Sequence, residues 1–314
     1  MNKEKSFISA VVYVHNNENS IYNFISDLIC LLDANFENSE IICVNDFSTD
    51  NSVSEIKRAS SDAGNVAMTV LNMSNFHGLE VAMNAGDELA IGDYLLEIDS
   101  AIPDYPIDTI MDVYRKVLEG YDIVSASPEI KQKLSSRVFY WLFHKFTNEQ
   151  GHTKMQTESF RILSRRAVNR IDAMNRIVLY RKTLYENCGL RTMRVTYKTN
   201  PCKKPEGDDT QNRRYRRSLA VDSLIMFTDM GYIIARFMTT IMLLFSIVMM
   251  LYTIVIYVSS NPVAGWTTTI MFLSVAFCGL FAILMVIVKY LQLILRLNFR
   301  RKKYSFESIE KLTK

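Results

Sequence analysis

One run of 52 residues, from Phe237 to Val288, contains no Asp, Glu, Lys or Arg, and it most constrains how this 314-residue chain folds. A polar break with the sequence SSNP, at residues 259–262, divides the run in two. Each half holds about 22 apolar residues, enough at a helical rise of ~1.5 Å per residue to span the ~30 Å hydrocarbon layer. We therefore predict a transmembrane hairpin. The alternative, a core hairpin of a soluble domain, is disfavoured because a short terminal segment does not cover so much apolar surface.

Basic residues flank this run on both sides, whereas the loop between its halves has no charge. Those before the run are Arg213, Arg214, Arg216, Arg217 and Arg236, and those after it are Arg296, Arg300, Arg301, Lys302 and Lys303. Because positive charge accumulates on the cytoplasmic side of a membrane, both termini and the soluble domain are predicted to be cytoplasmic. The expected location is the cytoplasmic membrane, in a multi-pass topology.

The rest of the composition fits one soluble domain with its own core. The net charge is only +3, with the positive charge concentrated beside the membrane segments. This distribution indicates contact with anionic lipid or phosphate, and it argues against nucleic acid. The five cysteines include no C-x-x-C pair, which indicates a reducing compartment and no zinc site. The apolar stretch at residues 7–14 is too short for a signal peptide, so the domain is not expected to be exported.

Strands and helices alternate along the soluble part. The predicted strands span residues 7–14, 40–44, 66–71, 94–98, 122–125, 159–163 and 193–197, and the predicted helices span 19–34, 52–60, 78–89, 107–118, 139–146 and 165–174. This order predicts an α/β fold with a mainly parallel sheet, which binds ligands beyond the carboxyl ends of its strands. Asp46 and Asp99 each follow a predicted strand and are candidates for that edge. The alternative is that they only stabilise turns.

Four motifs in order carry a family resemblance: HNNEN after the first strand, VNDFSTD after the second, SNFHGLEVAMNAGDELAIGD before the fourth, and EIDSAIPDYP after it. Together with TESFRILSRRAVNRI and the two-helix tail, they resemble the polyprenyl-phosphate glycosyltransferases of family 2, which have the GT-A fold. On this basis residues 1–212 are expected to form a GT-A domain. A basic, amphipathic juxtamembrane segment is expected at 213–236, the transmembrane hairpin at 237–295, and a basic cytoplasmic tail at 296–314.

The resemblance implies transfer of a sugar, with inversion, from a nucleotide-sugar to a polyprenyl phosphate in the bilayer, for a bacterial surface glycan. A UDP-linked donor is expected, and copies are expected to associate through the membrane helices. By position, nucleotide contacts fall on Asn16, Asp46 and Asp99, catalytic roles on Asp99, Arg161 and Lys182, and phosphate or acceptor contacts on Lys204, Arg213 and Arg214. Arg161 is as well explained by a structural salt bridge, and the basic residues before the membrane by lipid anchoring.

The metal motif departs from the family pattern. Family members carry an Asp-x-Asp-x-Gln run that holds Mg²⁺ or Mn²⁺, whereas this chain has Asp99, Ala101 and Pro103 there. Asp99 is thus the one ligand that the motif retains, with Asp104 nearby, and a single carboxylate binds a hard cation weakly. One alternative is that the arginines before the membrane run offset the diphosphate charge in place of the metal, namely Arg213, Arg214, Arg216 and Arg217. The other is that the chain is a catalytically silent GT-A-like scaffold. An enzyme acting on a different lipid acceptor is a third alternative.

Overall fold

The computed structural model describes residues 3–129, 158–174, 181–199, 230–259, 265–298 and 304–313. The chain divides into two compact units. The first contains the sheet and its helices and includes the C-terminal residues from Arg301 onward, and the second contains the two long apolar helices.

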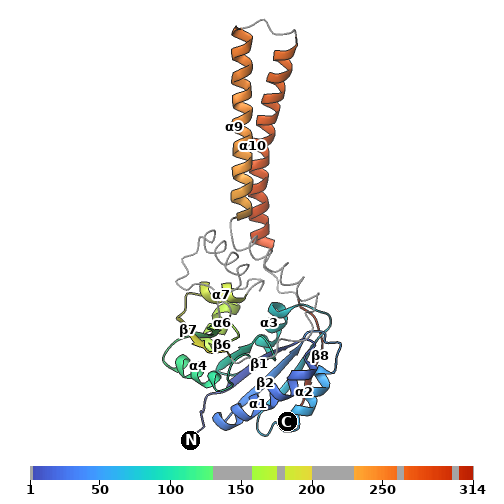
Figure 1. The fold of residues 1–314 in the computed structure, drawn as a ribbon, viewed down its shortest axis with the longest axis vertical. Helices are drawn as coiled ribbons and strands as arrows, with labels where there is room; N and C mark the ends of the chain where they lie inside the picture. The colour runs from blue at the N-terminus through green and yellow to red at the C-terminus, as the bar shows by residue number, and fades with distance from the viewer. Residues whose placement is uncertain are drawn as a thin grey trace. The chain divides into compact units, whose positions relative to one another are not determined.

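The elements of the first unit are β1 (Ile8–Val14), α1 (Glu18–Asn35), β2 (Ser39–Asn45), α2 (Ser52–Ser60), β3 (Ala67–Met73), α3 (Leu79–Leu89), β4 (Tyr94–Ile98), α4 (Thr109–Leu118), β5 (Ile123–Pro128), β6 (Phe160–Ser164), α6 (Arg165–Ala173), α7 (Arg181–Asn187), β7 (Thr192–Tyr197) and β8 (Phe306–Lys311). In the described residues, the strands form one sheet in the order β7-β5-β6-β4-β1-β2-β3-β8 (Figure 1). β6 and β8 are antiparallel to their neighbours, and the other pairs are parallel. The seven predicted strands are confirmed, as are all the predicted helices except 139–146, which lies outside the described residues.

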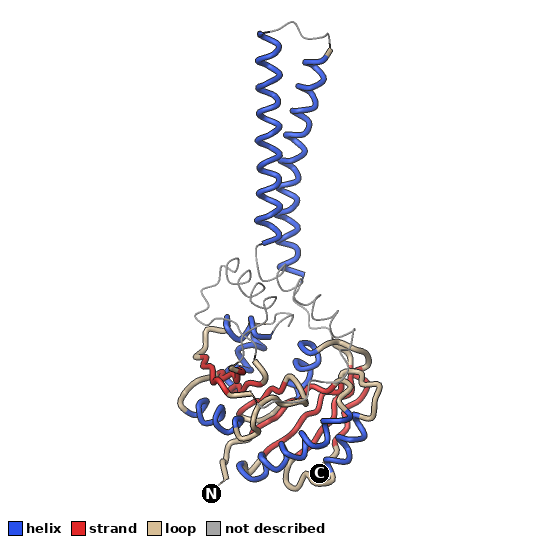
Figure 2. The backbone as a smooth tube through the Cα atoms, viewed as in Figure 1, coloured by secondary structure: helices blue, strands red, loops and turns tan. Residues whose placement is uncertain are grey.

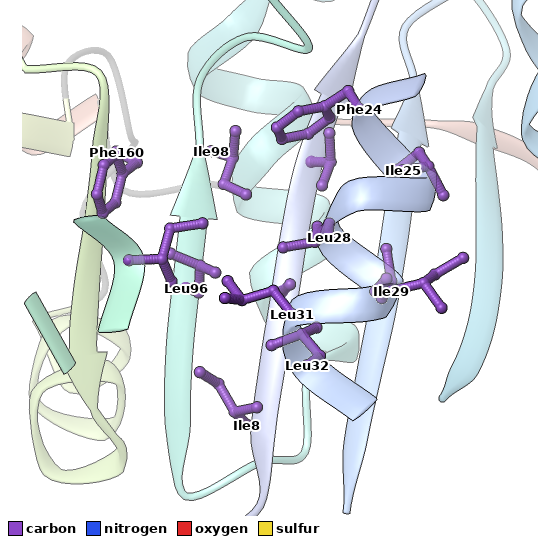
Figure 3. Close-up of a cluster of buried hydrophobic side chains, with 14 of the residues drawn as sticks. Ile8, Phe24, Ile25, Leu28, Ile29, Leu31, Leu32, Leu96, Ile98 and Phe160 are labelled. Carbon is purple, nitrogen blue, oxygen red and sulfur yellow. The ribbon is translucent and has the colours of Figure 1, made fainter. Parts of the chain in front are cut away.

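Helices cover both faces of the sheet because the buried strands are apolar on both sides. On one face, α1 packs through Phe24, Leu28 and Leu32 against Ile8 and Leu96 of the strands (Figure 3). α2 and α4 contribute to the same cluster. The opposite face is covered by α3, α6 and α7. When both faces of a parallel sheet are covered by helices, the ends of its strands are the part left accessible to a ligand.

α3 lies very close to the strands beneath it. A Cβ placed on Gly86 would lie 2.5 Å from Val11 Cγ1 and 2.6 Å from Val44 Cγ2. Real side chains do not approach so closely, so this position requires glycine. The close packing holds α3 directly against β1 and β2.

The C-terminal residues are not a free tail. β8 pairs antiparallel with β3, from Thr69 opposite Lys311 to Met73 opposite Phe306, and forms the last strand of the sheet (Figure 1). The sequence prediction of a tail over 296–314 therefore needs correction. The strand was missed because β8 has only two apolar residues, Phe306 and Ile309, and they do not alternate regularly with polar ones.

The second unit is a pair of packed helices, α9 (Met230–Ser259) and α10 (Trp266–Asn298) (Figure 2). Within them, Ala235–Ser259 and Trp266–Leu291 are long and apolar enough to cross a membrane. Most of their large apolar side chains are exposed to the surroundings, as expected for a lipid-facing pair. Most of the predicted juxtamembrane segment lies outside the described residues.

Candidate active site

The site begins at β4, whose last residues place two carboxylates on one face of the sheet. Side chains alternate along a strand, so Leu95, Glu97 and the following Asp99 point to the same side. Leu95 belongs to the apolar cluster under α3, α6 and α7. Glu97 is 1% exposed, and the Asp99 side chain is 13% exposed. Two acidic groups are therefore brought to the rim of a buried apolar layer, where their charge needs compensation.

Arg161 supplies part of that compensation. In the antiparallel β4·β6 pair it lies directly opposite Glu97. Its Nη1 donates to Glu97 Oε2 at 2.6 Å, and its Nη2 donates to Asp99 Oδ2 at 2.8 Å. Its Nε lies 3.4 Å from Glu158 Oε2. The side chain is 1% exposed, which favours the structural salt bridge over the predicted phosphate contact.

Arg181 completes the charge network from the first turn of α7. Its Nη2 donates to Asp99 Oδ1 at 2.7 Å, and its Nη1 donates to Glu97 Oε2 at 2.8 Å. Its Nε and backbone N–H both donate to Glu80 Oε2 on α3, at 3.1 and 3.0 Å. Tyr185, one helical turn later, donates its hydroxyl to Glu97 Oε1. Two guanidinium groups thus bind both oxygens of Asp99 and link α3, β4, β6 and α7.

Sequence reasoning assigned Lys182 and missed Arg181. The signal was present in the helical spacing, because Arg181, Leu184, Tyr185 and Cys188 form a stripe three to four residues apart, and all four are buried. Lys182 is adjacent and half-buried. It lowers the pKa of Asp99 together with the two arginines, so it lies within electrostatic reach of the predicted centre.

The electrostatics of this cluster favour a charged Asp99. Burial alone raises the pKa of Asp99, but Arg161, Arg181 and Lys182 outweigh it and hold that pKa below its ordinary value. Nearby Asp87 behaves oppositely. Burial, and then the charge of Glu97, raise the pKa of Asp87 well above the ordinary value. The network therefore maintains one ionised carboxylate at the rim and a second that keeps its proton to higher pH.

The described residues around Asp99 do not fit a divalent metal. Both oxygens of Asp99, the retained family ligand, accept hydrogen bonds from arginine. Asp104 uses Oδ1 to accept from the Tyr197 hydroxyl at 2.6 Å and from Ser159 at 3.2 Å. Across the described residues, no group of three His, Cys, Asp or Glu side chains could hold a metal ion. A cation placed beside Asp99 would also meet the repulsion of two guanidinium groups.

Asp46, at the end of β2, is a structural anchor in this conformation. It is completely buried. Oδ2 accepts from the Tyr13 hydroxyl at 2.9 Å and from the Gly78 N–H at 2.8 Å, and Oδ1 accepts from the His77 N–H at 2.8 Å. Its carboxylate joins the loop after β2 to the start of α3. Contact of Asp46 with a base or ribose stays a prediction.

Asn16 lies at the exposed rim beside it. Its backbone has a positive φ of 52°, its N–H donates to Ser48 Oγ at 3.1 Å, and its Oδ1 accepts from the Thr49 N–H at 2.9 Å. The loops after β1 and β2 are thus joined at the carboxyl edge of the sheet, where ligands of open α/β sheets bind. Asn16 is placed at the expected edge, and its nucleotide contact stays a prediction.

A small cavity lies under α7, between Arg161, Lys182, Tyr185 and Arg194. Its volume of about 30 Å³ suits a water molecule and not a sugar nucleotide. The predicted phosphate contacts Lys204, Arg213 and Arg214 lie outside the described residues.

The model of Glycosyl transferase family 2 matches residues 9–176, which is more than half of the chain. The chain belongs to this family. The match contains Asn16, Asp46, Asp99 and Arg161 and ends before Arg181. The glycosyltransferase assignment rests on this match. The charge network around Asp99 extends beyond the matched residues, because it includes Arg181.

Relatives of this glycosyltransferase agree with the family. An uncharacterized glycosyltransferase of Synechocystis is 26% identical over 85% of both chains. An undecaprenyl-phosphate 4-deoxy-4-formamido-L-arabinose transferase of Aeromonas hydrophila is 29% identical over 42% of this chain and 40% of that protein. A solved mycobacterial protein has a TM-score of 0.52 at 14% identity, covering 70% of this chain and 74% of that one, and indicates the fold alone.

Proposed function

We propose that this glycosyltransferase moves a sugar from a UDP-linked donor to the phosphate of a polyprenol held in the bilayer, with inversion at the anomeric carbon. The observation that carries the proposal is the pairing of a family 2 domain with two helices long and apolar enough to cross a membrane. Such helices hold a domain beside a lipid acceptor. The undecaprenyl-phosphate transferase named among the relatives supports the same acceptor class.

The chemistry suits the groups at this site. A phosphate oxygen is anionic at neutral pH, so it attacks the anomeric carbon without prior deprotonation by a strong base. The new C–O bond forms as the bond to the nucleoside diphosphate breaks, and the diphosphate leaves with the electron pair. The protein must position the reactants and stabilise the negative charge of the leaving group.

Within the described part of the site, Lys182 is the cation best placed for such a role, because it is half-buried and near Asp99. Arg161 and Arg181 hold Asp99 rigidly at the rim, where it can orient the donor. Lys204, Arg213 and Arg214 are proposed to contact the acceptor phosphate. The glycosyltransferase domain and both termini are proposed to face the cytoplasm of a bacterium, because basic residues flank the transmembrane hairpin on both sides.

The test is transfer from radiolabelled UDP-sugars by the purified full-length protein in vesicles containing undecaprenyl phosphate. Label should become extractable into organic solvent and should be released again by mild acid. Vesicles without the acceptor, and the same protein with GDP-sugars, are the controls. If no UDP- or GDP-sugar gives lipid-linked label, the proposed reaction is excluded. If label appears on lipids other than undecaprenyl phosphate, the proposed acceptor is wrong.

A catalytically silent scaffold is the second candidate, and the saturation of Asp99 by two arginines is the observation that favours it. In a silent scaffold, the charge network serves only to bind α7 to the sheet. Calorimetry of the same preparation with UDP and with undecaprenyl-phosphate vesicles separates the two. Binding of the lipid vesicles without any binding of nucleotide supports the scaffold.

A further inference from the structure

Phe47 combines two properties that are unusual together. Its backbone has a positive φ of 56°, and its side chain is 49% exposed. A bulky residue in this backbone region is strained, whereas glycine or asparagine adopts it readily. Isolated exposed apolar residues are common and need no explanation. An exposed aromatic ring on a strained backbone does call for an explanation, because backbone strain is concentrated at ligand sites.

The loop around Phe47 is held on both sides. On one side, Asp46 is anchored by its buried carboxylate, and its carbonyl oxygen lies 2.7 Å from His15 Nδ1. On the other side, the Ser48 N–H donates to Asn45 Oδ1 at 3.1 Å, and the Thr49 N–H donates to Asn16 Oδ1 at 2.9 Å. These bonds fix the conformation on either side of Phe47. The ring is therefore presented from a pre-organised loop, which lowers the entropy cost of binding a ligand.

The position of Phe47, in the loop just after β2, suits the base end of a nucleotide. β2 and β4 both flank β1, and Val12 of β1 is in register with Cys43 and with Ile98. The residues that follow Cys43 and Ile98, including Phe47 and Asp99, therefore leave the sheet at the same carboxyl edge. Two strand spacings of ~4.8 Å separate β2 from β4 by ~10 Å. A nucleotide lying along the edge can place its base over β2 while its phosphates lie towards β4.

We propose that Phe47 is the stacking platform for the nucleobase of the donor. This inference rests on the proposed function and assigns the base end of its donor site. A flat aromatic ring binds the face of any base and does not itself read the hydrogen-bonding edge. Phe47 therefore supplies affinity for the base, and polar groups of the rim, such as the exposed Asn16, supply any discrimination between bases.

The experiment is calorimetric titration of the full-length protein with UDP, comparing Phe47→Asn, Phe47→Trp and the parent. Asn adopts positive φ, so Phe47→Asn should retain or raise the unfolding temperature while weakening UDP binding by about tenfold. Phe47→Trp should bind UDP as tightly as the parent. Leu118→Ala is the matched control, because Leu118 is also 49% exposed and lies at the end of α4, and it should leave UDP binding unchanged.

The outcomes separate the two proposals. Equal UDP affinity in the parent and Phe47→Asn overturns the stacking role while leaving the glycosyltransferase proposal intact. A parent protein that binds neither UDP nor GDP overturns both. If Phe47→Asn instead weakens association with anionic vesicles and leaves UDP binding unchanged, the ring is a lipid contact and the inference is wrong.

Discussion

Arg161 on β6 lies directly opposite Glu97 on β4, and their Nη1 and Oε2 atoms are 2.6 Å apart. This strand pairing brings the buried Arg161 guanidinium to Glu97, whose carboxylate also accepts hydrogen bonds from Arg181 and Tyr185. Glu97 therefore forms the centre of the network, and Asp99 lies at its rim. A buried charge network of this kind makes the position of Asp99 depend on three other elements of the fold.

Replacing Arg181 should destabilise the domain far more than replacing its neighbour. Arg181→Met leaves Glu80, Glu97 and Asp99 without one of their cations, and such a loss from a buried network costs about 3–5 kcal/mol. Lys182→Met removes a half-buried charge that is not part of the Arg181 ion pairs, and it should cost under about 1 kcal/mol. Denaturant unfolding of the full chain in detergent measures both. Similar losses for the two variants would show that Arg181 is not the structural cation.

The low pKa of Asp99 predicts how stability depends on acid. A carboxyl whose folded pKa is lowered stabilises the fold above its unfolded pKa, near 3.8, and loses this contribution as pH falls through the lower folded value. Unfolding free energy should therefore fall steeply below about pH 4. Asp99→Asn should be less stable at pH 7 and should show a shallower acid dependence, measured by denaturant unfolding across pH 3–7. An unchanged slope would contradict the charge compensation described here.

Metal should have little influence on nucleotide binding. Because arginine occupies both oxygens of Asp99, UDP affinity in calorimetry should change by less than about twofold between EDTA and millimolar Mn²⁺. Transfer activity should likewise persist in EDTA. A tenfold or greater gain of UDP affinity on adding Mn²⁺ would mean that the arginines release Asp99 when substrate binds.

Removing the last strand should loosen the edge of the sheet. Truncation before Tyr304 deletes β8, exposes the β3 edge, and removes the bond from the Ser305 N–H to His77 Nε2. We expect a lower unfolding temperature and faster hydrogen exchange in β3, because its amides lose their partners. Deleting only Lys314 is the control and should change neither quantity. Unaltered β3 exchange in the longer truncation would show that β8 does not stabilise the sheet in solution.

The sequence by itself determined the βα alternation, the carboxyl-edge placement of Asp99, and the apolar hairpin, because these depend on local periodicity and on charge-free length. α2 and β4 even keep their predicted ends, at Ser52–Ser60 and Tyr94–Ile98. Only the tertiary structure decided that Arg161 and Arg181 neutralise Asp99, that Asp46 is buried under the start of α3, and that the C-terminal residues return to the sheet. Those relationships join segments that are distant in sequence. Strand pairing and helix packing determine which charged groups meet, and local sequence pattern does not.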